Sequence, residues 1–179
     1  MNILNPFRMI VRPALPLVLV ALGVAFSPAN ATTTGGIEAK AAFARMKSLS
    51  GDWVGPKMMG TRMNMDFRVI AAGSAVLATC FAGTRNEMIT VYYLNGDKLV
   101  QTHYCMLGNQ PRMKLNTKKS SADTLLFDFA GGDNISSTKM NMHGQTLRFI
   151  GRNKIESTCT SEEKGKPSST HAMVLVRKQ

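Results

Sequence analysis

The sequence predicts an all-β protein, an antiparallel up-and-down (meander) β-barrel of about ten strands with a short N-terminal helix. Many short segments after Gly51 alternate apolar and polar residues, which is the pattern of half-buried strands. Turn-rich pieces separate these segments, and Asn95-Gly96 is a strong signal for a tight hairpin. No strand–helix–strand alternation is visible, and closing a meander removes both exposed edges.

A helix is predicted before the first strand, because Phe43, Met46 and Leu49 recur at helical spacing among good helix formers. We expect it to end near Ser50 and Gly51, with the glycine as a left-handed cap. A long connection is expected over residues 131–145, and a turn over residues 162–169. The expected strands are residues 51–55, 61–70, 74–82, 87–94, 98–105, 112–116, 124–130, 146–151, 154–161 and 171–178.

Residues 1–31 are predicted to be a signal peptide. The N-terminal region carries two arginines and is followed by the apolar run of residues 14–26. Ala29-Asn30-Ala31 then provides the small residues typical of a signal-peptide cleavage site. The apolar run is shorter than the roughly 20 residues that span a bilayer. We therefore expect cleavage after Ala31 and a periplasmic or secreted protein that is not an integral membrane protein once processed. Residues 32–179 are expected to form a single domain.

The charge of the chain favours contact with anionic surfaces. It has 22 Lys and Arg against 11 Asp and Glu, a formal net charge of +11. The bases are scattered as singles and pairs, and few aromatic residues interleave with them, so nucleic acid is not expected as a partner. We expect weak contact with an anionic envelope surface. An envelope-associated structural or interaction protein is therefore an alternative function.

The order of helix, Gly51-x-Trp53 and successive strands resembles the calycin group, which includes lipocalins and fatty-acid-binding proteins. In those families the tryptophan packs across the closed end of the barrel. Residues 71–113 resemble the middle of an uncharacterised group of exported bacterial lipocalin-like proteins, and this likeness covers roughly residues 48–178. It implies a lipocalin/fatty-acid-binding-protein-like barrel and no established activity. Nitrobindin-type barrels begin similarly and hold haem through a late histidine; His171 has a comparable place in different surroundings, so haem is a minor alternative.

Alternation sorts the hairpin of residues 88–105 into two faces. Tyr92, Gln101, His103 and Cys105 share one face, and an apolar set occupies the other. If the first face points inward, it lines a mostly apolar pocket with a few polar groups, as small-ligand sites require. If it points outward, the barrel has a filled core.

The leading hypothesis is an exported, non-enzymatic binding protein for a small, largely apolar or amphiphilic molecule, with no cofactor. The residues expected to contact the ligand are Trp53, Tyr92, Gln101, His103 and Arg112. No catalytic constellation is visible, so no catalytic residue is predicted.

The sulfur-containing residues leave two further questions open. The three cysteines, Cys80, Cys105 and Cys159, allow either one disulfide with a free thiol or three buried thiols. No Cys-x-x-Cys spacing indicates zinc. Soft thioethers beside an imidazole suit Cu(I), which makes Met140, Met142 and His143 weak metal candidates. Core packing is the simpler explanation of these methionines.

Overall fold

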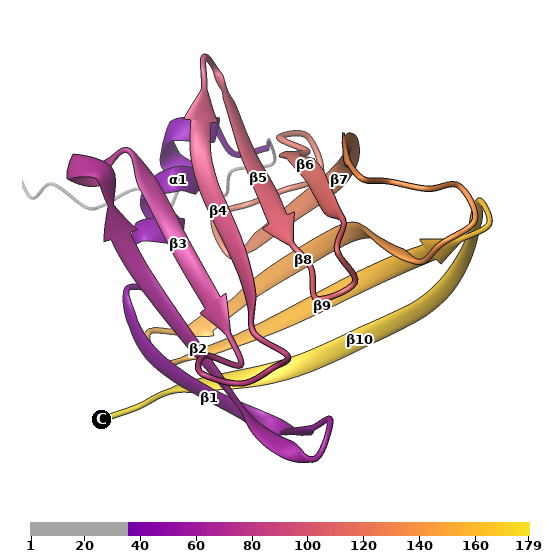
Figure 1. Ribbon diagram of the computed structural model, residues 1–179. Helices are drawn as coiled ribbons and strands as arrows, with labels where there is room; N and C mark the ends of the chain where they lie inside the picture. Colours follow the sequence, from indigo (N-terminus) through magenta and orange to yellow (C-terminus); the bar gives the residue numbers. More distant parts are fainter. Residues whose placement is uncertain (1–35) are drawn as a thin grey trace, which may run out of the picture. The chain divides into compact units, whose positions relative to one another are not determined.

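The computed structural model describes residues 36–179, so the signal-peptide prediction lies outside the described residues. The described chain forms one α-helix, a short 3₁₀ turn and ten antiparallel strands that close into a barrel in meander order (Figure 1). The predicted fold class is thereby confirmed. The elements are α1 (Ala39–Lys47), β1 (Gly51–Met58), β2 (Thr61–Ile70), η1 (Ala71–Gly73), β3 (Ala75–Cys80), β4 (Met88–Asn95), β5 (Lys98–Tyr104), β6 (Gln110–Leu115), β7 (Thr124–Asp133), β8 (Asn141–Gly151), β9 (Lys154–Glu163) and β10 (Lys166–Arg177).

The β4–β5 hairpin has the division into two faces that the sequence predicts. Asn95 pairs with Lys98 around a two-residue turn, and Gly96 takes the positive φ of 61° that such turns require. Tyr92 lies opposite Gln101, and both side chains are buried. Because side chains alternate along a strand, this pair fixes the inward face of both strands.

Two predicted connections are shorter than the sequence suggested. Strands β7 and β8 extend into the expected connection, so only residues 134–140 lie between them. Strands β9 and β10 likewise continue as a long hairpin to a turn at Lys164 and Gly165, seen at the right of Figure 1. The polar extensions of these strands lack an apolar face, so alternation gave no strand signal there.

One end of the barrel is closed by α1 and by Trp53. The helix packs against β4 and β5 and buries Ala42, Phe43 and Met46. Trp53 is fully buried, with its ring edge-on to Phe67 at 6.3 Å between centroids. Its indole N–H donates a 2.7 Å hydrogen bond to the Leu49 carbonyl in the segment between α1 and β1. This bond holds the chain after the helix onto the barrel end.

Arg177 completes the closed end from the last strand. It pairs with Trp53 across the β1–β10 seam, and its guanidinium lies over the indole, 4.4 Å from the ring centroid. The same guanidinium donates to the carbonyls of Ser48, at 2.9 Å, Leu49, at 3.5 Å, and Ser50. One charged group therefore contacts three successive carbonyls of the segment that joins α1 to β1.

The predicted glycine cap is wrong in its detail. The helix ends at Lys47, and its cap residue Ser48 keeps a right-handed backbone. Gly51 instead begins β1 with φ 124°, and a Cβ there would lie 2.8 Å from Nη1 of Arg177. The glycine is thus needed for close approach of the arginine, while the backbone N–H of Ser48 caps the helix.

Replacing Trp53 by Phe removes the indole N–H and leaves the buried Leu49 carbonyl without that donor. We expect the free energy of unfolding to fall by about 2–4 kcal/mol, from the lost hydrogen bond and the lost volume. Denaturant titration followed by circular dichroism measures it. Tyr104→Phe is the control, because Tyr104 is 50% exposed and surface changes alter stability by less than about 0.5 kcal/mol. Equal losses in the two variants would contradict the role of Trp53.

Candidate functional site: a methionine-lined cavity

The end of the barrel opposite α1 contains a cavity of about 340 Å³. β1 begins beside the helix, so the β1–β2, β3–β4, β5–β6 and β7–β8 connections all lie at this other end. The closed half of the barrel is filled by fully buried side chains such as Leu99, Leu125 and Leu175. The interior is therefore packed at one end and hollow at the other.

Sulfur dominates the wall of the cavity. Its lining includes the three cysteines, two histidines and nine methionines: Met58, Met59, Met63, Met65, Met88, Met106, Met140, Met142 and Met173. Leu107 is the one aliphatic branched residue in this lining, and none of the lining residues is Asp, Glu, Lys or Arg. Methionine has a flexible, polarizable side chain, so such a wall adapts its shape to what it holds.

A line of hydrogen bonds crosses the barrel at the cavity. The hydroxyl of Tyr92 on β4 donates to Oε1 of Gln145 on β8 at 2.9 Å, and Nε2 of Gln145 lies 3.5 Å from Oγ of Ser157 on β9. Phe127 packs edge-on against the Tyr92 ring. Burial raises the pKa of Tyr92, so its phenol remains a neutral donor. These polar groups sit in an otherwise apolar wall and can orient a ligand.

His103 on β5 also lines the cavity. Its Nδ1 forms a 2.8 Å hydrogen bond with the hydroxyl of Thr90, its partner across the β4–β5 ladder. Burial lowers the pKa of His103 to about 4, because the charged imidazolium is poorly solvated there. At neutral pH the ring is therefore uncharged.

All three cysteines are free thiols. Burial, together with the smaller effect of the nearby Cys159, raises the pKa of Cys80 to about 12. Burial likewise raises the pKa of Cys159 to about 11, against the hydrogen bond from Ser157, which lowers it. Both groups remain protonated at neutral pH and are weak nucleophiles in that form.

The structure brings only part of the predicted ligand set to the cavity. Tyr92 and His103 line it. Gln101 is fully buried beside Tyr92, with an amide oxygen that lacks a hydrogen-bond partner, and Trp53 belongs to the closed end. Arg112 lies elsewhere: its neighbours in β6 point inward, and its exposed guanidinium sits 3.4 Å from Asp133 on the outer surface.

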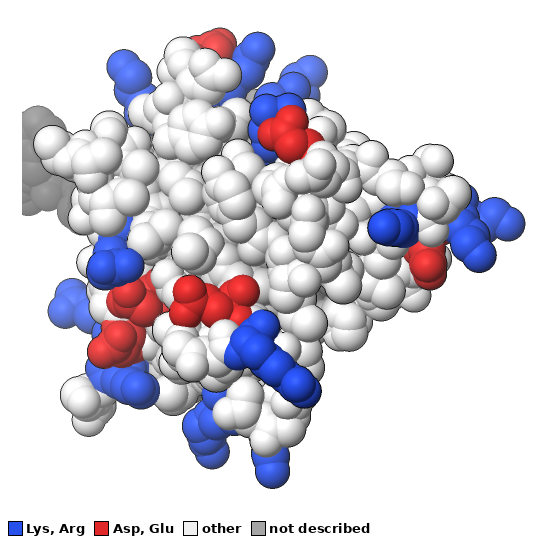
Figure 2. Space-filling model, viewed as in Figure 1, with Lys and Arg blue, Asp and Glu red and all other residues white. Residues whose placement is uncertain are grey.

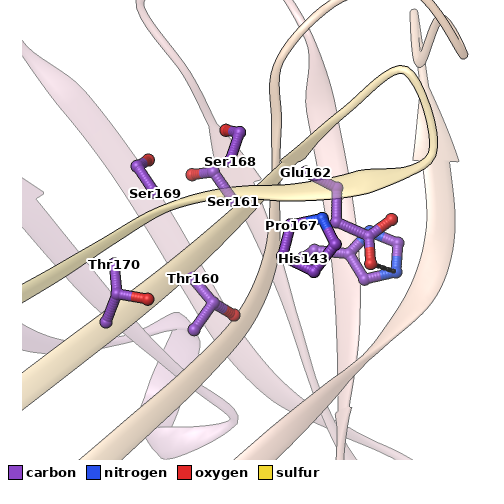
Figure 3. A pocket seen from close by; sticks show the side chains of 8 residues that line it. All are labelled: His143, Thr160, Ser161, Glu162, Pro167, Ser168, Ser169 and Thr170. Carbon is purple, nitrogen blue, oxygen red and sulfur yellow. Dashed lines mark ion pairs between the residues drawn. The ribbon is translucent and has the colours of Figure 1, made fainter.

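The weak metal candidates are divided between two places. Met140 and Met142 line the cavity, whereas His143 lines a separate groove of about 410 Å³ formed with β9 and β10. There its Nε2 lies 3.4 Å from Oε1 of Glu162, the ion pair drawn in Figure 3, and its ring stacks on Phe129 at 4.1 Å. His143 faces away from Met142 because consecutive residues of a strand point to opposite faces. These three residues are not one set of ligands.

The methionine lining is the feature that sequence reasoning missed. Met63 and Met65 were recognisable as an inward stripe, and Met88 as part of the hairpin's inward face. Their convergence with Met173 depends on closure of the barrel, because these residues lie on β2, β4 and β10. The available signal was a high methionine content, 13 of 179 residues, which does not by itself indicate where the side chains meet.

Over residues 36–179, no three His, Cys, Asp or Glu side chains gather in a metal-binding arrangement. In the same part of the chain, no helix has the length and apolar character required to cross a membrane. Comparison with protein-family models gives no match. Comparison with curated proteins gives none either.

The depressed pKa of His103 predicts a pH-dependent stability. Between about 4, its pKa in the fold, and 6.5, its ordinary value, the unfolded chain binds the proton more readily, so stability falls as pH falls. A single group contributes at most about 1.4 kcal/mol per pH unit. We expect His103→Gln, which stays neutral, to lose this part of the pH dependence in denaturant titrations from pH 4 to 7. Parallel pH profiles of the two proteins would contradict the assignment.

Proposed function

We propose that this protein is an exported, non-enzymatic binding protein that holds a small, largely apolar or amphiphilic molecule in its barrel. The observation that carries the proposal is the cavity of about 340 Å³, lined by methionines and free of charged residues. Its volume falls in the range of about 300–1,000 Å³ that small-molecule sites occupy. Export rests on the signal-peptide pattern of residues 1–31, and the lipocalin-like resemblance agrees with ligand binding inside a barrel.

Polar groups in the wall give the ligand its orientation. The hydroxyl of Tyr92 and the amide of Gln145 hold each other, and neutral His103 is held by Thr90. A ligand with one hydrogen-bonding group can exchange partners with them while its apolar body contacts the methionines. Because thioethers adapt to different shapes, the site favours a class of related molecules over a single rigid one.

Filling the cavity tests this function. Ala78 lies on the cavity wall and is 3% exposed. We expect Ala78→Leu to weaken binding of the neutral apolar fluorophore N-phenyl-1-naphthylamine by about tenfold or more, because 1–3 kcal/mol of contact is displaced. Fluorescence titration of the wild-type protein should saturate at one molecule per chain.

The matched control is Thr102→Leu. Thr102 lies between Gln101 and His103 on β5, and because those two side chains face inward, the added bulk lies on the outer face. It should bind the fluorophore as the wild type does, and thermal melting should show that both variants fold. Absence of saturable binding to the wild type, or equal weakening in both variants, would refute ligand binding in the cavity.

A second candidate function is contact with an anionic membrane surface through the cavity mouth. Met59, Met106, Leu107 and Met140 are 38–55% exposed there. The mouth segments, residues 57–62, 81–87, 105–109, 134–140 and 163–166, carry six Lys and Arg and two Asp and Glu. Apolar tips among basic residues suit the boundary between acidic headgroups and lipid chains.

The basic residues do not form one broad face in the view of Figure 2. In the view of Figure 2, Lys and Arg stand in separate groups, and the acidic residues gather mainly in one area. If the segments around the cavity opening bind the membrane, the cavity lies at the lipid surface. An apolar ligand can then enter it without crossing water. This candidate therefore complements the first one.

Binding to lipid vesicles tests whether the residues at the cavity mouth contact a membrane. We expect Met106→Ser/Leu107→Ser to reduce sedimentation with phosphatidylglycerol vesicles several-fold, because about 25 cal/mol per Å² of apolar burial is lost. Ile150→Ser/Val174→Ser, which changes exposed apolar residues on other strands, is the control. Binding should weaken at high salt and be absent with neutral phosphatidylcholine vesicles. Identical sedimentation of the two double variants would refute docking through the mouth.

A further inference from the structure

Three sulfur-bearing side chains stand side by side on the inner wall of the barrel. Cys80 on β3 pairs in register with Met65 on β2 and with Met88 on β4. All three line the cavity. Directly paired residues of antiparallel strands have Cβ atoms about 4.5–5.5 Å apart. The flexible methionine side chains can therefore bring both thioether sulfurs to the thiol between them.

Met65 and Met88 differ in setting from the methionines that fill the core. Methionine usually fills irregular gaps in a core, as fully buried Met46 and Met113 do here. Met65 and Met88 are only partly buried and face open volume. Leucine and aromatic residues make up most of the fully buried side chains, whereas nine methionines and three cysteines line the hollow, so sulfur is concentrated beside the cavity.

The charge of the surroundings limits which metal ion Met65, Cys80 and Met88 can bind. The cavity lining contains no Asp, Glu, Lys or Arg, so any net charge brought there lacks a compensating side chain. One thiolate with one monovalent cation gives a neutral site, whereas a divalent ion would leave a buried positive charge. Thiolate and thioether donors are soft ligands, which favour Cu(I).

We propose that Met65, Cys80 and Met88 bind one Cu(I) ion through one thiolate and two thioethers. Binding replaces the Sγ–H bond of Cys80 by an Sγ–Cu(I) bond and releases the proton to solvent, and copper keeps its oxidation state. This site goes beyond the proposed ligand binding and does not depend on it. It also differs from the candidates Met140, Met142 and His143, which the structure divides between two places.

The surroundings of Cys80 give the site a pH signature. Its thiol is protonated at neutral pH without metal, so each bound Cu(I) releases one proton. Apparent affinity should then rise about tenfold per pH unit below the thiol pKa. The other titratable groups that line the cavity are Cys105, Cys159, His103 and His171, with the hydroxyl of Tyr92. Cys159 and His103 are uncharged at neutral pH, and Cys80 is the thiol that lies in register between two methionines.

The test is Cu(I) binding to the fully reduced protein without oxygen, in competition with the chromophoric chelator bicinchoninate. We expect one Cu(I) per chain and release of one proton. Cys80→Ser should weaken binding by more than about 100-fold, since loss of outer-shell partners alone costs 10- to 100-fold. Met65→Leu/Met88→Leu, which keeps the apolar volume, should weaken it by at least about tenfold.

Two matched variants distinguish the proposed Cu(I) site from the other methionines and cysteines that line the cavity. Met140→Leu/Met142→Leu and Cys159→Ser should bind Cu(I) as the wild type does. Unchanged binding in Cys80→Ser, absence of stoichiometric binding in the wild type, or equal losses in the matched variants would each overturn the proposal. Thermal melting establishes that each variant folds.

Binding of N-phenyl-1-naphthylamine separates the two proposals. A wild-type protein that binds Cu(I) but not the fluorophore would refute only the apolar-ligand function. One that binds the fluorophore but not Cu(I) would refute only the metal site.

Discussion

The seam between the first and last strands is the constraint on which the rest of the barrel depends. Strands β1 and β10 pair through only two residue pairs, Trp53 with Arg177 and Val54 with Val176. At that point Arg177 stacks on the indole and donates to carbonyls after α1, so one side chain joins helix, first strand and last strand. Beyond it, Pro56 lacks an N–H and the β1 register shifts. Firm closure is thus confined to the end where the core is packed.

The two halves of the interior have different chemistry for this reason. Leucine, phenylalanine and tryptophan fill the closed half, where branched and aromatic side chains pack at high density and carry the stability. Methionine and cysteine line the open half, where packing is incomplete. The hydrogen bonds from Tyr92 to Gln145 and from Gln145 to Ser157 tie β4, β8 and β9 together across this open region. The packed core and the cavity therefore lie at different ends of one barrel.

The proposed apolar ligand and the proposed Cu(I) ion use different properties of the same wall. An apolar molecule uses the volume and adaptability of the thioethers, and it needs no particular register between strands. A metal ion uses the alignment of Cys80 with Met65 and Met88, which only the register of three neighbouring strands creates. The lining has no Asp, Glu, Lys or Arg, and this suits both proposals. It favours an uncharged organic ligand, and it favours a Cu(I)–thiolate pair whose charges cancel.

Local patterns in the sequence determined the fold class, the β4–β5 hairpin and the sharing of one face by Tyr92, Gln101 and His103, because alternation repeats every two residues. Which face points inward, and whether the interior is hollow, was decided by the tertiary structure. Arg112 shows the limit: it was predicted to contact the ligand, but it lies outside because β6 presents its neighbours to the core. The methionines and cysteines of the cavity come together only when the barrel closes and the strands pair in register. These contacts join residues far apart in the chain, so no periodic pattern in the sequence indicates them.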